Sequence, residues 1–167
     1  MAVIETERLI LRELTPADAA FVHALLTDAA FLEHIGDRGV RTPEDAARVI
    51  PERYIAGYAR DGFGMWAVDE RDGGATVGLA GLVDRDGLDH IDLGYALLPA
   101  ARGRGYAVEA ARAVADWAAH RGIAPLLAIV SRGNPRSVAV LERIGFAAAG
   151  TITLPRDDVP VLLYRKD

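Results

Sequence analysis

The chain is organised around a short stretch rich in glycine and arginine, residues 97–107, which reads Leu-Leu-Pro-Ala-Ala-Arg-Gly-Arg-Gly-Tyr-Ala. An apolar run typical of a strand precedes it, at residues 89–98, and an alanine-rich helical pattern follows, at residues 106–120. The first N–H groups of a helix have no intrahelical partner and lie at the positive end of its dipole. Glycines at alternate positions let an anion approach the backbone closely. The stretch therefore predicts a phosphate site, although a turn with solvated arginines that binds nothing is an alternative.

The size and charge of the chain limit what this anion could belong to. A length of 167 residues with 51% hydrophobic residues predicts one globular domain, residues 1–167. The absence of cysteine excludes disulfides, thiolate catalysis and cysteine zinc sites, and we expect no metal site. A net charge of −5 argues against nucleic acid as a partner. No apolar run or leader-like segment indicates a membrane or secretion, so we expect a cytoplasmic protein.

The first third of the chain predicts one strand and two helices. Residues 7–14 read as a strand, and the Thr15-Pro16 pair that follows is a helix start signal. Residues 31–39 read as irregular. Thr42-Pro43 opens a second helix that should extend to about Ala59, with a kink or break at Pro51. These helices would pack their apolar side against a sheet.

From Gly64 onward the apolar residues alternate, which is typical of strands joined by tight turns. The later helix starts at Asn134-Pro135 and stops at Gly145. The expected strands are residues 65–68, 76–83, 89–98, 126–130, 147–154 and 159–165. The order predicts an α/β fold with a mixed, mostly antiparallel sheet of about seven strands and about four flanking helices. Only the strand–helix–strand unit at residues 89–130 should be parallel.

Three motifs, taken with their order and spacing along the chain, resemble the GCN5-related N-acetyltransferase (GNAT) superfamily, in its RimJ/RimL-like branch. The first is Arg102-x-x-Gly105-x-Ala107, which fits the pyrophosphate signature of the family. The second is Asn134-x-x-Ser137 with residues 141–146, which fits the late helix ending in Gly-Phe. The third is the opening strand at residues 6–12. The resemblance covers nearly the whole chain.

The resemblance implies acetyl-CoA as the acetyl donor and a cleft between two parallel strands that splay apart. Backbone amides of the glycine turn would hold the pyrophosphate, and the pantetheine arm would pair with the preceding strand. An amide near Leu97 or Leu98 would polarise the thioester carbonyl. The cofactor-binding residues it implies are Ala96, Leu97, Leu98, Arg102, Gly103, Arg104, Gly105, Tyr106, Ala107, Asn134 and Ser137.

Two residues are candidates for the chemistry. Asp92 lies within an apolar strand and is a candidate base for the amine, although a hydrogen-bonded strand aspartate is an equally good interpretation. Ser137 could hydrogen-bond the departing sulfur or only cap its helix. Many family members carry a tyrosine acid on the late helix, where this chain has Leu141. We interpret Tyr95 as a core residue.

These features predict an N-acetyltransferase that moves the acetyl group of acetyl-CoA to a primary amine by direct attack in a ternary complex. The acceptor would be a peptide N-terminal α-amine or a small-molecule amine. The sequence leaves the oligomeric state open, and a homodimer is one alternative. A non-catalytic acyl-CoA-binding module is the alternative that Leu141 motivates. A Rossmann oxidoreductase is a third, but Val108 stands where that motif needs its third glycine.

Overall fold

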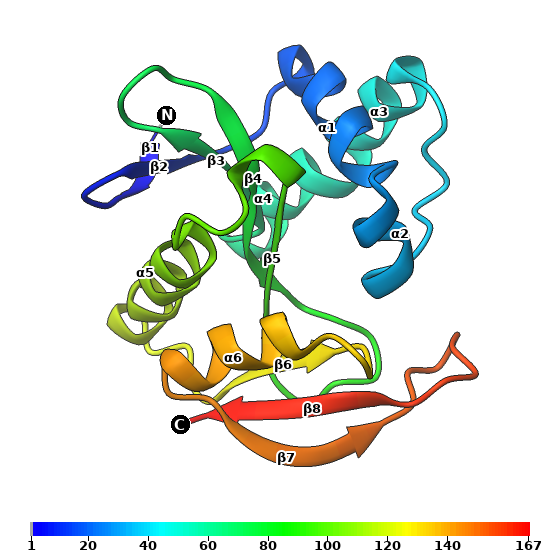
Figure 1. Cartoon of the computed structure of the whole chain (residues 1–167), viewed down its shortest axis with the longest axis vertical. Helices are drawn as coiled ribbons and strands as arrows, with labels where there is room; N and C mark the ends of the chain where they lie inside the picture. Colours follow the sequence, from blue (N-terminus) through cyan, green and yellow to red (C-terminus); the bar gives the residue numbers. More distant parts are fainter. Residues whose placement is uncertain (1) are drawn as a thin grey trace.

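The computed structural model describes residues 2–167 as one eight-stranded sheet with helices on both faces (Figure 1). The strand order is β1-β2-β3-β4-β5-β6-β8-β7, and every neighbouring pair is antiparallel except β5–β6, which is parallel. The strands are β1 (Ala2–Glu5), β2 (Leu9–Arg12), β3 (Met65–Glu70), β4 (Thr76–Val83), β5 (Asp92–Leu97), β6 (Leu126–Val130), β7 (Ala147–Ile152) and β8 (Val161–Lys166). The predicted mixed, mostly antiparallel α/β sheet is confirmed.

The helices divide between the two faces of the sheet. The α-helices are α1 (Ala19–Leu26), α2 (Ala29–His34), α3 (Pro43–Val49), α4 (Ala56–Asp61), α5 (Tyr106–His120) and α6 (Pro135–Arg143). Helices α5 and α6 pack on one core cluster, and α1, α2 and α3 pack on a second cluster across the sheet. No helix within residues 2–167 is long and apolar enough to cross a bilayer.

The N-terminal strand differs from the prediction because the chain folds back at Thr6. The predicted single strand at residues 7–14 is instead the second arm of a hairpin, β1–β2. Thr6 makes the turn: its N–H donates to the Leu9 carbonyl at 2.9 Å, and its hydroxyl accepts the Leu9 N–H at 2.9 Å. The first arm has only four residues at the sheet edge, which is too short for a readable alternation.

Two details of the early helices also differ. Helix α2 falls in the segment predicted as irregular, and the Asp28 side chain caps it by accepting the Phe31 N–H at 3.2 Å. The break expected at Pro51 is a π-helical turn, residues 50–55, that joins α3 to α4 without interrupting the helix. Proline has no N–H to donate, and the wider turn accommodates that loss.

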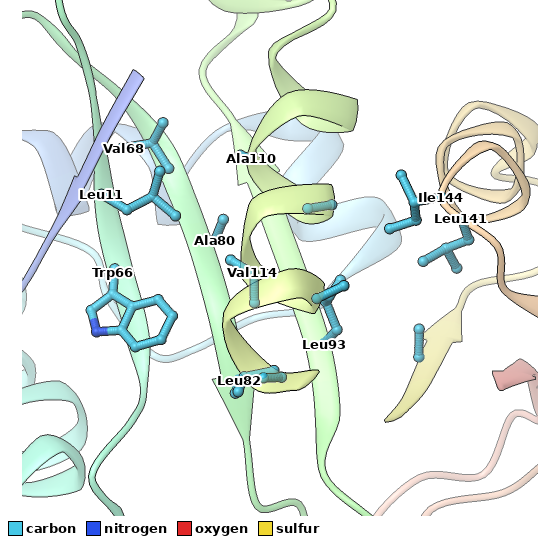
Figure 2. Packing of buried hydrophobic residues seen from close by; sticks show 14 of the residues in the cluster. Leu11, Trp66, Val68, Ala80, Leu82, Leu93, Ala110, Val114, Leu141 and Ile144 are labelled. Atoms are coloured by element: carbon cyan, nitrogen blue, oxygen red, sulfur yellow. The ribbon is translucent and has the colours of Figure 1, made fainter. Parts of the chain in front are cut away.

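A dense apolar core lies between the sheet and α5 (Figure 2). Val114 and Ala110 of α5 face Ala80 of β4, and Trp66 of β3 contacts Trp117 edge to face, with ring centroids 4.9 Å apart. Leu141 of α6 belongs to the same cluster. The core therefore fixes α5 and α6 on the sheet beside the parallel strand pair.

The parallel strands β5 and β6 separate soon after they meet. Their ladder has a single pair, Asp92 with Leu127, next to a bond from the Leu127 N–H to the Ile91 carbonyl at 2.9 Å. From that point to the end of β5 at Leu97 the two strands diverge. The gap opens into a cleft of about 1330 Å³, as the family resemblance implied.

Candidate active site

The cleft collects the segments that the sequence singled out. Its walls come from β5, the glycine turn, the end of β6 and the start of α6, together with residues from the α2–α3 and β4–β5 loops. In Figure 1, β5 stands between the helices α1–α3 and the lower group of β6, β8, β7 and α6. A ligand in this cleft would contact segments that lie between Ala30 and Val161 in the sequence.

The glycine turn offers a row of free amides to the cleft. Gly103 and Gly105 have φ of 75° and 79°, a region that side chains disfavour, and α5 begins at the next residue. Within residues 2–167, the N–H groups of residues 103–107 have no protein acceptor. Successive free N–H groups at a helix N-terminus form a concave anion site. This geometry agrees with the phosphate site that the sequence predicts, and the binding of a phosphate there stays a prediction.

Both the backbone N–H and the side chain of Arg102 make hydrogen bonds within the protein. Its backbone N–H donates to the Pro99 carbonyl at 3.2 Å, so this amide does not join the free row. Its guanidinium donates to the Asp28 carboxylate at 2.6 Å and to the Leu97 carbonyl at 3.0 Å. Arg102 thus ties α2 to the end of β5 and fixes the turn, which differs from the amide contact that the resemblance implied.

The side chains of Arg104 and Tyr106 also point into a protein network. Arg104 donates to the Glu70 carboxylate at 2.5 Å, and Tyr106 donates its hydroxyl to the same oxygen at 3.0 Å. The Arg104 guanidinium lies 4.5 Å from the centre of the Tyr106 ring. Arg104 does not line the cleft, whereas Tyr106 does. What these two residues can offer a phosphate is their backbone amides.

The edge of β5 that faces the cleft is set by its register with β4. The Leu98 N–H donates to the Val77 carbonyl at 2.8 Å, and antiparallel bonding alternates along a strand. Ala96 therefore also bonds to β4, while the backbone groups of Tyr95 and Leu97 face the gap. This excludes the Leu98 amide as a donor to a thioester and leaves Leu97, and Tyr95 behind it.

Asp92 lies where the two strands meet and is 1% exposed. The Arg85 guanidinium, from the β4–β5 loop, donates to one of its carboxylate oxygens at 2.5 Å. Burial raises the pKa of Asp92 to about 6, although the charge and hydrogen bond of Arg85 act in the opposite direction. A carboxylate with this pKa in a cleft can hold or release a proton near neutral pH.

This environment predicts a pH effect on stability. Because the folded pKa of Asp92 is raised, its ionisation disfavours folding, and the loss develops as pH rises from about 4 to about 6. Between pH 4 and pH 6, we expect the free energy of unfolding of the Asp92→Asn variant to rise by about 3 kcal/mol relative to that of the wild type. Urea unfolding at pH 4, 5, 6 and 7 checks this. A stability difference that does not change with pH would contradict it.

At the start of α6, Ser137 lies against Tyr95 of β5. The two hydroxyl oxygens are 2.6 Å apart, and the Tyr95 hydroxyl also donates to the Ser137 carbonyl at 3.0 Å. The Asn134 side chain caps the helix by accepting the Ser137 N–H at 3.4 Å. Burial raises the pKa of Tyr95 to about 12, so the phenol stays protonated. All three residues line the cleft.

Sequence reasoning assigned Tyr95 to the core and missed this pair, since 42 residues separate its members. Leu141, at the position where a tyrosine was considered, is 1% exposed and reaches the same cleft wall. One further contact crosses the site: the His34 Nδ1 atom of α2 lies 3.1 Å from the Ser131 hydroxyl, in the loop after β6. It links the helical side of the cleft to the β6 side.

A cleft between splayed parallel strands, with a row of free amides at the end of one of them, is consistent with an acyltransferase of the CoA-dependent class. Residues 8–147 match the family model described as the acetyltransferase (GNAT) domain. The chain belongs to this family, and it is an acetyl-CoA-dependent acetyltransferase.

Known proteins of this family resemble the chain over most of its length. The crystal structure of an acetyltransferase from Agrobacterium tumefaciens superposes with a TM-score of 0.82 at 31% identity, covering 98% of this chain and 93% of that one. The uncharacterized N-acetyltransferase YoaA of Bacillus subtilis is 25% identical over 90% of this chain and 85% of its own. RimL, a ribosomal L7/L12 alpha-N-protein acetyltransferase solved with coenzyme A, shares the fold at 19% identity. The two structures superpose with a TM-score of 0.83, and the match covers 99% of this chain and 97% of that one.

Proposed function

We propose that this protein transfers the acetyl group of acetyl-CoA to the nitrogen of a primary amine, by direct attack while both substrates are bound. The observation that carries the proposal is the row of free amides at residues 103–107, beside a strand whose open edge faces the same cleft. The amine belongs to a peptide N-terminus or to a small molecule. Relatives named as N-acetyltransferases support this choice of acceptor atom.

Acetyl-CoA fits the cleft in one direction. Its diphosphate would lie on the amides of Gly103, Gly105 and Ala107, and the pantetheine arm would run along the open edge of β5 toward Asp92. The peptide groups of pantetheine would bond to the backbone of Tyr95 and to the N–H of Leu97, as an added strand does, while the Leu97 carbonyl accepts from Arg102. The side-chain NH2 of Asn134, whose carbonyl oxygen caps α6, would donate to this arm from the opposite wall.

The residues of the cleft divide the steps of the transfer. A backbone N–H of the open β5 edge would donate to the thioester oxygen as charge develops there. The amine nitrogen forms a bond to the carbonyl carbon, its proton passes to the Asp92 carboxylate, and the carbon–sulfur bond breaks. The Ser137 hydroxyl, held 2.6 Å from the Tyr95 hydroxyl, would donate to the departing sulfur. Since a thiol has a pKa near 8.5, it leaves as thiolate without a strong acid, and Leu141 is no obstacle.

The test is release of the coenzyme A thiol in the presence of acetyl-CoA and a panel of amines and peptides. We expect release that depends on an amine, with one acetylated product per thiol by mass spectrometry. Binding of acetyl-CoA without turnover on any acceptor would contradict the proposal and favour a binding module. Acetylation on a hydroxyl instead of a nitrogen would also overturn it.

The Tyr95–Ser137 pair predicts a moderate effect on turnover alone. We expect Ser137→Ala and Tyr95→Phe each to lower kcat about fivefold, because each removes one hydrogen bond of the pair beside the sulfur, worth about 1 kcal/mol. The Kd of acetyl-CoA should stay within about threefold. In the double variant the losses should not add, because the two hydroxyls act as one unit. Additive losses, or equal changes in kcat and Kd, would show that the pair only supports the fold.

A further inference from the structure

One wall of the cleft is unusually rich in arginine. Arg38 comes from the α2–α3 loop, Arg53 from the π-helical turn and Arg85 from the β4–β5 loop, and all three line the cleft with Asp92. Arg53 donates to the backbone carbonyl of Arg38 at 3.0 Å, which holds the two segments together. Arg38 and Arg53 belong to the helical segments on the second face of the sheet, and Arg85 contacts Asp92 at the end of β5 opposite the glycine turn.

Most other charges around this wall are neutralised within the protein. Asp37 pairs with Arg41 at 2.5 Å, Asp61 with Arg60 at 2.7 Å and Asp92 with Arg85 at 2.5 Å. Arg38 differs, because its half-buried guanidinium has no ion pair or hydrogen bond within residues 2–167.

The surroundings of Arg38 disfavour its charge. Burial lowers the pKa of Arg38, and the neighbouring charges of Arg85 and Arg53 lower it further, whereas Tyr54 and Asp157 oppose this. A cation that is partly removed from water and repelled by its neighbours is costly unless an anion joins it. A guanidinium presents a planar fork of donors that matches a carboxylate.

We propose that Arg38, with Arg53 beside it, binds a carboxylate carried by the acceptor, so that the substrate is an amine bearing a negative group rather than a polycation. This rests on the proposed function, since it assigns a substrate class to the same site. Arg38 and Asp92 line the same cleft, and Arg85 contacts Asp92 directly. An acceptor would therefore present its amine to Asp92 and its carboxylate to Arg38.

Two sources can supply this chemistry: a free amino acid, or a peptide whose N-terminal residue is followed by aspartate or glutamate. The experiment measures kcat/KM for matched acceptors in both arms. In the peptide arm, the second residue is Glu, Gln or Lys. In the amino-acid arm, the free acid is compared with its amide. We expect the carboxylate to be preferred at least tenfold in one arm, and that arm identifies the source.

The variants connect this preference to Arg38. In Arg38→Gln we expect the preference to fall to about threefold or less, through a higher KM for the acid and little change for the neutral acceptor. Arg38→Lys should keep part of it. Arg48→Gln, an exposed arginine of α3 outside the cleft, is the matched control and should keep all of it. Equal kcat/KM for acid and amide in the wild type, or a preference that survives in Arg38→Gln, would overturn the inference.

A binding measurement separates this inference from the proposed function. Calorimetry of the same acidic and amide acceptors against protein saturated with coenzyme A needs no turnover. Tighter binding of an acid to the wild type than to Arg38→Gln supports the carboxylate site even if no acetylation occurs. Turnover of neutral or cationic amines, with no acid bound more tightly than its amide, would keep the proposed function and contradict the carboxylate site.

Discussion

Replacing Ala107 by aspartate should abolish acetyl-CoA binding without unfolding the protein. Ala107 lies in the first turn of α5 and lines the cleft beside the free amides. An added carboxylate there would meet the diphosphate, and juxtaposed like charges cost several kcal/mol. We expect the Kd for acetyl-CoA to rise about 100-fold or more, measured by calorimetry at low salt.

The same substitution has a built-in control for folding. A negative charge in the first turn of a helix is favourable by about 0.3–1 kcal/mol, so the Tm of Ala107→Asp should be unchanged or slightly higher. Ala107→Asn has nearly the same size without the charge, and it should lose much less affinity. If Ala107→Asp binds acetyl-CoA as the wild type does, the diphosphate does not lie on this turn. If the aspartate and asparagine variants lose affinity equally, size and not charge explains the loss.

Replacing Asp92 by asparagine should have the largest effect on the chemistry. Asparagine keeps the shape but cannot take the proton of the amine, and a positioned base contributes about 10²–10⁴-fold. We expect kcat/KM to fall at least 100-fold. Because burial raises the pKa of Asp92 to about 6, wild-type kcat/KM should rise with pH through about 6, where the carboxylate becomes ionised. That rise should be missing in the variant.

Two measurements distinguish this role from a structural one. The Kd for acetyl-CoA should be unchanged in Asp92→Asn, because the carboxylate lies at the far end of β5 from the turn, roughly 16 Å along the strand. The free energy of unfolding of Asp92→Asn should rise relative to that of the wild type between pH 4 and pH 6, as argued above from the cost of burying the charge. A variant that keeps its activity, or loses activity but retains the rise near pH 6, would show that Asp92 is not the base.

The sequence predicts well those helices and strands whose ends are marked by capping, proline or turn residues next to them. Helix α5 begins after a glycine at positive φ, and α6 begins at an asparagine cap followed by proline, so both starts agree with the prediction. The β4 and β6 bounds agree for the same reason, since turn residues flank an apolar run. The hairpin arm β1 and the short helix α2 were missed because four to six residues carry too little pattern.

In the candidate site, the local backbone geometry could be predicted from the sequence, but the contacts of the side chains could not. The free amides at the turn follow from local chemistry, because two glycines and a helix start determine them. The hydrogen-bond partners of the side chains do not follow from local sequence. Arg102 meets Asp28 across 74 positions, and Tyr95 meets Ser137 across 42. Such pairs depend on how the sheet and helices pack. Only the structure could show that Arg102 links α2 to β5, and that the Arg38 guanidinium has no hydrogen-bond or ion-pair partner among residues 2–167.

The central claim is that the amides of residues 103–107 bind the diphosphate of acetyl-CoA. Backbone amide NMR during a titration with acetyl-CoA tests it most directly, with the signals of Gly103 and Gly105 as reporters. The account predicts large saturable shifts at both glycines, with smaller shifts along the open edge of β5 at Tyr95 and Leu97. Saturation of binding while both glycine signals stay in place would contradict it.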